Sequence, residues 1–332
     1  MHFSSKPSLY PTALLALALS VAIAAPAAAQ SPATAAPGKA AAAAAPAKGR
    51  TMQQILDASR PSDWRALDPN NTLYLELARG RVVIELAPQF APAHVANIRA
   101  LAVNGYWNGL SINRSQDNYV VQWGDANAED ASKRKDFGRG FKPKLPAEFA
   151  RTSKGLSMTV LPDNDGWAPQ AGFVAGFPAA RDSADGNSWL AHCYGTVGAG
   201  RDLAADSSNG AELYVVIGQS PRHLDLNITT VGRVIKGMEL LSSLPRGTGP
   251  LGFYETAEER TPIKAIRLAA SVPKAERATI EVLRTDTPLF ADLVESRRNR
   301  QDDFYKRPAG HINICNVPLP VRDQAVEKKA GK

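Results

Sequence analysis

The chain is poor in the residues on which metal sites and covalent catalysis depend. It has two cysteines among 332 residues, and no metal-ligand spacing connects its histidines, which are His2, His94, His192, His223 and His311. No G-x-S-x-G nucleophile elbow occurs. Asp163–Gly166 lacks the further ligands of a calcium loop, while Gly198–Gly200 and Gly247–Gly249 are too short for phosphate loops. We therefore expect neither a metal nor a cofactor.

The charge balance gives little reason to expect a nucleic-acid partner. The 39 basic and 32 acidic residues leave a formal charge of +7, which is modest for this length. The basic residues are scattered or form small clusters at 133–135 and 297–300, without an accompanying aromatic or glycine pattern. Because nucleic-acid modules combine a basic face with such a pattern, we interpret both clusters as solvated surface.

A long apolar run lies at the N-terminus. Lys6 precedes the run Ala13–Ala25, and the small residues Ala27–Ala29 end it. This pattern predicts a secretory signal peptide over residues 1–29. The alternative is a membrane anchor, but the run is short for a span. We expect export to the periplasm, with no stable membrane insertion after cleavage.

The only cysteines, Cys193 and Cys315, are far apart in the sequence. Exported proteins experience oxidising conditions, and an even number of cysteines then favours one disulfide between them. Two buried free thiols are the alternative.

Beyond an Ala/Pro-rich linker at 30–50, the hydrophobic pattern predicts a mainly β domain. Met52–Leu67 has the spacing of a short helix or lead-in. Alternating apolar residues on both sides of Arg79 and Gly80 predict a β-hairpin, and Pro92 begins a helical pattern that ends at Gly105. Further strands are predicted at 209–217, 229–234 and 265–269, and a short helix at 237–244.

Two regions fall outside this pattern. The stretch 133–187 is rich in Pro, Gly, Asp and Ala, but its Trp167, Phe173 and Phe177 argue for packing rather than disorder. In the tail, Thr287 and Pro288 begin a helix with a basic C-terminal end. The apolar segment after that helix is expected to pack on the preceding domain.

The stretch Ile112–Asp125, INRSQDNYVVQWGD, holds the residues most suited to chemistry. Period two places Val120 and Gln122 on one strand face, with Tyr119 and Val121 on the other. Together with Arg114, this is an apolar patch framed by a cation and an amide, which can bind and donate hydrogen bonds. Binding and hydrogen-bond donation are sufficient to catalyse rotation about an X-Pro bond. The barrier to this rotation, roughly 18–20 kcal/mol, comes from the loss of amide resonance, and no covalent bond has to break.

This stretch resembles the corresponding motif of the cyclophilins, in which an arginine, a short loop, an aromatic, an apolar residue, a glutamine and Gly-Asp follow in the same order. The resemblance continues through Val82–Leu101 and Asn209–Leu241. It implies a closed eight-stranded β-barrel capped by two α-helices. The implied layout is a lead-in at 51–70, a cyclophilin-like domain at 71–270 with an insertion at about 133–187, and a C-terminal helical extension at 271–332.

The resemblance also implies a site centred on Arg114. In the family this guanidinium donates a hydrogen bond to the proline nitrogen as that nitrogen pyramidalises, which stabilises the transition state. A surface arginine is the alternative, as is core packing for each apolar neighbour. The implied substrate-binding residues are Tyr119, Val120, Gln122, Gly200, Arg201, Glu212, Tyr214, His223 and Leu224.

Several positions depart from the family's pattern. Many cyclophilins have a tryptophan where this chain has His223, a histidine where it has Ile228 and a glutamine where it has Glu212. Tyr119 and Tyr214 replace phenylalanines, which adds hydroxyl groups that need partners or water. We expect these changes to lower activity and to weaken binding of the cyclic peptide drug known for the family.

We therefore predict a peptidyl-prolyl cis-trans isomerase that acts on proline-containing clients among exported proteins. The alternative is a catalytically weak or silent cyclophilin-like module for binding or chaperoning. A third interpretation is a structural envelope protein in which the linker displays the barrel.

Overall fold

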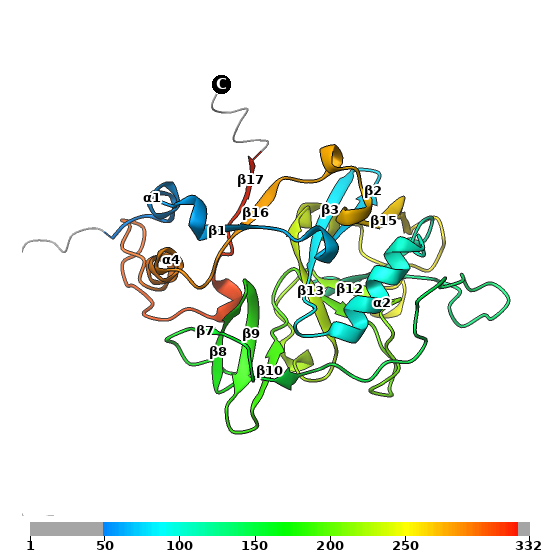
Figure 1. The fold of residues 1–332 in the computed structure, drawn as a ribbon, viewed down its shortest axis with the longest axis horizontal. Coiled ribbons are helices and arrows are strands. Elements are labelled where there is room, and N and C mark those ends of the chain that lie inside the picture. Colours follow the sequence, from blue (N-terminus) through cyan, green and yellow to red (C-terminus); the bar gives the residue numbers. More distant parts are fainter. Residues whose placement is uncertain (1–48, 325–332) are drawn as a thin grey trace, which may run out of the picture. The chain divides into compact units, whose positions relative to one another are not determined.

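The computed structural model describes residues 49–324, so the predicted signal peptide and nearly all of the predicted linker lie outside the described residues. Within this range the strands form three antiparallel sheets, accompanied by four α-helices (Figure 1). None of these helices has the length and hydropathy needed to span a membrane.

The largest sheet has nine strands and is mainly responsible for the β character of the fold. Its strand order is β14-β4-β5-β12-β11-β13-β3-β2-β15, and it curls into a half-barrel (Figure 1). The strands are β2 (Thr72–Leu77), β3 (Gly80–Leu86), β4 (Ser111–Ser115), β5 (Val120–Gly124), β11 (Thr196–Ala199), β12 (Leu213–Val216), β13 (Thr230–Lys236), β14 (Thr261–Pro262) and β15 (Ala265–Leu268).

The expected closed eight-stranded barrel is wrong, because this sheet is open and has nine strands. Its edge strands β14 and β15 are separated in sequence only by Ile263 and Lys264. The Ile263 N–H donates to the Leu110 carbonyl (2.8 Å), whereas the Lys264 N–H donates to the Glu76 carbonyl (2.9 Å). Pro262 has no N–H to continue the β14 ladder. The segment thus changes partner strand, and no single strand pairs on both sides to close the barrel.

The predicted hairpin is confirmed as β2 and β3. Leu73 pairs with Ile84 and Leu75 with Val82, and all four side chains are buried. Alternate residues of a strand share one face, so this register directs the apolar set of both strands into the same core.

The two helices predicted within the barrel region are present as α2 (Pro92–Val103) and α3 (Met238–Ser242). Ile98 and Leu101 of α2 and Leu241 of α3 join the main hydrophobic core. Trp107 and Trp123 are the largest fully buried side chains of that core. The core therefore fills the space between the sheet and these helices.

The stretch 133–187 contains most of a second, five-stranded sheet rather than a loop. Its strand order is β6-β10-β9-β8-β7. Phe173 and Phe177 are buried as expected from packing, but the Trp167 side chain is 55% exposed. The strands are β6 (Arg151–Thr152), β7 (Thr159–Val160), β8 (Gln170–Val174), β9 (Phe177–Asp182) and β10 (Asn187–Leu190).

The lead-in and the tail form the third sheet, so the tail is not purely helical. The elements are α1 (Met52–Asp57), β1 (Trp64–Ala66), β16 (Ile280–Leu283), α4 (Pro288–Arg298) and β17 (Val321–Asp323), with sheet order β1-β16-β17. Helices α1 and α4 lie side by side (Figure 1). Ile55, Phe173, Phe290, Leu293 and Ile314 share a second core, which joins the lead-in, the insertion and the tail.

The predicted disulfide is confirmed, since Cys193 is bonded to Cys315 across a sequence separation of 122 residues. Cys193 lies just before β11, and Cys315 lies in one of the short 3-10 helices. These are η1 (Pro61–Asp63), η2 (Pro69–Asn71), η3 (Arg222–Leu224), η4 (Pro250–Gly252), η5 (Ala269–Ser271), η6 (Lys274–Glu276) and η7 (Ile314–Asn316). The disulfide fastens the tail to the segment that enters the main sheet.

Candidate active site

A β-bulge determines the direction of the Arg114 side chain. Ile112 pairs with Trp123, but Arg114 pairs with Gln122, so β4 uses two residues where β5 uses one. Ile112 and Trp123 are buried in the main core. Without the extra residue Asn113, strand alternation would direct Arg114 into that core as well. The bulge instead places Arg114 opposite Gln122 on the other face of the sheet.

Three neutral acceptors hold the Arg114 guanidinium. Its Nε donates to the Leu251 carbonyl (2.8 Å), Nη1 donates to Gln122 Oε1 (3.2 Å), and Nη2 donates to Gln116 Oε1. The guanidinium carries five N–H groups, so two remain for a ligand. The three acceptors therefore orient the planar group and leave it able to donate further hydrogen bonds to a ligand.

Among residues 49–324, the hydrogen-bond acceptors of Arg114 are all neutral, and no carboxylate contributes to its pKa shift. Its guanidinium carbon lies 5.6 Å from the Tyr119 ring centre and 5.3 Å from that of Phe253. Burial lowers the pKa of Arg114 from its ordinary value, and Tyr119 opposes this shift. Arginine nevertheless stays charged at neutral pH. A half-buried cation between two aromatic rings is thus available to a polar group of a ligand.

The loop that accepts from Arg114 has a tightly constrained backbone. Leu251 and Gly252 have φ values of 57° and 79°. A Cβ at Gly252 would lie 2.5 Å from the Cα of Gln116, closer than side chains approach backbone. Because Gln116 also accepts from Arg114, the loop and the guanidinium are positioned together.

Gln122 links Arg114 to a second ionisable group. Its Oε1 accepts from Arg114, and its Nε2 donates to Glu212 Oε2 (3.2 Å). Burial raises the pKa of Glu212, the hydrogen bond from Gln122 opposes this, and Asp125 adds to the rise. The amide of Gln122 thus has a defined orientation between a cation and a carboxyl group.

An apolar cluster adjoins this polar group. Val120, Tyr214 and Val216 are buried together, with Tyr119 and Ile228 packed against them. The predicted alternation placed Tyr119 with Val121, on the opposite face from Val120. The structure corrects this, because β5 begins at Val120 and the alternation does not extend into the preceding turn. Tyr119 therefore joins the Val120 cluster.

A cavity of about 680 Å³ adjoins the side chains of Gln122 and Glu212. Of the predicted substrate-binding residues, it is lined by Gln122, Gly200, Arg201 and Glu212. Phe253, which faces Arg114, also lines it. Arg114 and the apolar cluster around Val120 are not among its lining residues, so the cavity approaches the guanidinium only through Gln122 and Phe253.

Comparisons with known proteins identify the family of the chain. The family model for cyclophilin type peptidyl-prolyl cis-trans isomerase/CLD matches residues 72–270. The chain belongs to the cyclophilin family. The match includes Arg114, Gln122 and the apolar cluster around Val120, so this cyclophilin carries its candidate site within the family domain.

Relatives of this cyclophilin include a probable peptidyl-prolyl cis-trans isomerase of Brucella suis biovar 1 (strain 1330), 28% identical over 188 residues, which are 55% of this chain and 76% of the relative. Peptidyl-prolyl cis-trans isomerase-like 1 of Homo sapiens is 30% identical over 108 residues, 32% of this chain and 63% of the relative. The crystal structure of cyclophilin AquaCyp293 from Hirschia baltica has a TM-score of 0.63 at 26% identity and covers 82% of this chain and 97% of that chain. That likeness extends beyond residues 72–270.

The remaining predicted residues of this cyclophilin lie on two neighbouring segments. Arg201 donates through Nε to the Asn227 carbonyl (2.8 Å), which joins the loop after β11 to the segment after η3. His223 and Leu224 belong to η3, where His223 is exposed. No direct contact joins either residue to Arg114 in the described part of the chain.

Sequence reasoning missed several residues that contact the predicted site. Gln116, Leu251 and Phe253 all contact Arg114. The glycine-dense stretch before Phe253 is a usable signal, because closely spaced glycines indicate a constrained loop. The Tyr214 hydroxyl, which was expected to need a partner or water, has a partner in His192, whose Nε2 lies 2.9 Å away. No local pattern marks His192, since the contact joins distant segments.

Proposed function

We propose that this cyclophilin accelerates rotation about X-Pro peptide bonds, with Arg114 as the hydrogen-bond donor to the proline nitrogen. The observation that carries the proposal is the Arg114 guanidinium, which neutral acceptors orient beside an apolar cluster. A donor fixed before the reaction favours the pyramidal nitrogen over the planar amide, which lowers the barrier.

The apolar cluster fits the other requirement of the reaction. A proline ring seated against Val120, Tyr119 and Tyr214 would lose water and be held while the preceding residue turns. Gln122 would contact the polypeptide backbone from the adjoining wall. Since no bond forms or breaks between heavy atoms, these binding interactions suffice for the chemistry.

The biological role that we propose is assistance to the folding of exported proteins in the periplasm. Uncatalysed X-Pro isomerisation takes about 10–100 s at 25 °C, slow enough to limit folding. The signal-like sequence at residues 1–29 supports the exported location. Sequencing the mature N-terminus tests it, since retention of those residues would contradict export.

The first experiment compares the wild type with Arg114→Ala on a set of X-Pro peptides. We expect the wild type to accelerate isomerisation and the variant to lose at least tenfold in kcat/KM, equivalent to about 1.4 kcal/mol of barrier. Far-UV circular dichroism checks that both proteins are folded. A folded wild type that accelerates none of the peptides would refute the proposal.

A binding module with little turnover is the second candidate. The observation in its favour is that neither Arg114 nor the apolar cluster lines the cavity beside Gln122 and Glu212, so a polypeptide bound there would not have to meet the guanidinium. Calorimetric peptide binding without isomerisation would support this candidate against the first.

A further inference from the structure

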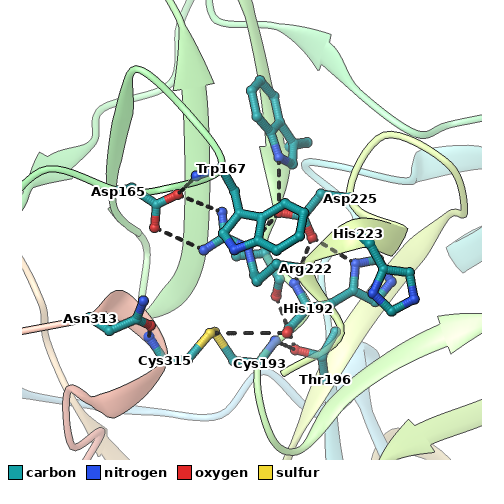
Figure 2. Close-up of polar contacts among 12 residues, drawn as sticks. Asp165, Trp167, His192, Cys193, Thr196, Arg222, His223, Asp225, Asn313 and Cys315 are labelled. Carbon is teal, nitrogen blue, oxygen red and sulfur yellow. Dashed lines mark hydrogen bonds and ion pairs between the residues drawn. A yellow bond between two sulfur atoms is a disulfide. The ribbon is translucent and has the colours of Figure 1, made fainter. Parts of the chain in front are cut away.

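A chain of polar contacts connects the apolar cluster to the inserted sheet region. The Tyr214 hydroxyl lies 2.9 Å from His192 Nε2, and His192 Nδ1 lies 2.8 Å from Asp225 Oδ1. Arg222 Nε donates to Asp225 Oδ2 (2.6 Å), and its two terminal nitrogens donate to Asp165 (2.9 and 3.0 Å). Figure 2 shows the part from His192 to Asp165 as a continuous set of contacts.

Every member of this network is removed from water. The side chains of Arg222 and Asp165 are 3% and 2% exposed, and those of His192 and Asp225 are buried as well. Unpaired charges in such surroundings would be strongly unfavourable, but both carboxylates here have charged or hydrogen-bonding partners. The contacts therefore fix the geometry of the side chains as well as balancing their charges.

The protonation states suit a rigid network. Burial by itself would raise the pKa of Asp225, but the His192 hydrogen bond and the charge of Arg222 outweigh it, so the pKa of Asp225 is lowered. Burial raises the pKa of Tyr214, which therefore keeps its hydroxyl proton at neutral pH. The Tyr214 hydroxyl can then donate to His192 Nε2, while His192 Nδ1 contacts Asp225 Oδ1.

The network reaches the predicted proline pocket at two points. Tyr214 on β12 is part of the apolar cluster. Arg222 is the first residue of η3, which continues into His223 and Leu224. The far end is Asp165, in the insertion between β7 and β8. A single insertion residue is thus connected to both the wall and the rim of the pocket.

A second ion pair of the same insertion offers a comparison. Asp163 accepts from Arg298 Nε (2.9 and 2.8 Å) and from the Ile312 N–H (2.9 Å). These partners belong to α4 and to the segment before η7, in the tail. Asp163 therefore fastens the insertion to the tail, without a contact to η3 or Tyr214 among the described residues.

We propose that Asp165, Arg222, Asp225 and His192 are positioning residues for substrate binding, which hold the Tyr214 ring and η3 in place. The inference rests on the isomerase function proposed above. The network supports the pocket rather than Arg114, so it sets the affinity for the proline-containing segment and leaves the rotation step nearly unchanged. The insertion thereby contributes to the isomerase site without touching the substrate.

The test uses Asp165→Asn, Tyr214→Phe and the double variant in the full chain, with Asp163→Asn as the matched control. Although many cyclophilins have phenylalanine at the position of Tyr214, the hydroxyl of this chain lies 2.9 Å from buried His192 Nε2. We therefore expect each single variant to raise KM for an X-Pro peptide at least fivefold and to change kcat less than twofold. The double variant should match the larger single effect within twofold, because both changes interrupt one network. Asp163→Asn should leave KM within twofold of the wild type.

Three results would overturn the proposal: an unchanged KM in Tyr214→Phe, independent effects that multiply in the double variant, or an equal rise of KM in Asp163→Asn. Tyr214→Phe removes one oxygen atom and carries the test if Asp165→Asn does not fold. If the wild type is inactive, the isomerase proposal fails. Calorimetric Kd values for the same peptide then decide the positioning role, by the same fivefold criterion.

Discussion

Glu212 shows how a single ionisable side chain near the candidate site affects stability. Its backbone carbonyl accepts from the Gly200 N–H (2.9 Å), and its side chain accepts from Gln122. Because Glu212 is half-buried, its charged form is less favourable in the folded protein, and desolvation raises its pKa. Ionisation of this carboxyl group therefore lowers the free energy of unfolding.

We predict that Glu212→Gln raises the thermal stability at pH 7. With a raised pKa in the folded state, the folded protein binds the proton more tightly than the unfolded chain does. The stabilisation from Glu212 is then complete below its ordinary pKa and is lost as pH rises through the folded-state value. Melting temperatures measured from pH 4 to pH 8 should show an advantage of the variant at pH 7 that disappears toward pH 4.

The control for this prediction is Glu258→Gln, which removes the same charge from an exposed side chain. It should follow the wild type across the pH range within the error of the measurement. A Glu212→Gln protein that melts below the wild type at pH 7 would contradict the assigned direction of the pKa shift.

At the scale of elements, the local sequence pattern predicted individual strands more reliably than it predicted whether the sheet closes into a barrel. The hairpin of β2 and β3 follows from alternating apolar residues, and the Thr287 cap correctly predicted α4. The open edge of the main sheet was not predictable in this way, because it depends on the partner change around Pro262. For the candidate site, the motif predicted that Gln122 helps to orient Arg114, and the two side chains are hydrogen-bonded, but their register depends on the bulge at Asn113.

We predict that the conformation of the η4 loop is required to position Arg114. In Gly252→Ala the new Cβ would meet the backbone of Gln116, and φ is positive, so the loop must shift. We expect the Leu251 carbonyl to leave Arg114, with a loss of at least tenfold in kcat/KM. The strained backbone should also lower the free energy of unfolding by about 1–3 kcal/mol.

Gly155→Ala is the control that distinguishes backbone strain from displacement of the η4 loop. Gly155 has a φ of 77°, but nothing lies within 4 Å of the point that its Cβ would occupy, so only the backbone strain is shared. Denaturant unfolding should show a stability loss in both variants, while kcat/KM falls only in Gly252→Ala. Full activity in Gly252→Ala would mean that the loop does not position Arg114.

At the scale of the whole molecule, the described chain has a main core and a second core built from segments far apart in sequence. Composition alone predicted the insertion as packed, but its sheet and its contacts with α4 depend on long-range pairs such as Phe173 with Phe290. Asp165 and Arg222 likewise meet only after folding. Sequence periodicity does not report such pairs, which explains why the lead-in and tail strands were missed.

The disulfide should stabilise the fold as a whole, because it joins two distant parts of the chain. Cys315→Ser removes a link over 122 residues that joins the tail to the segment entering β11. The unfolded chain gains freedom when this link is lost, so we expect the free energy of unfolding to fall by about 2–4 kcal/mol. Urea denaturation followed by tryptophan fluorescence measures the change, and the wild type under reducing conditions should match the variant. If reduction leaves the wild-type midpoint unchanged, the tail is held by the second core alone, through contacts such as those of Ile314 and Phe290.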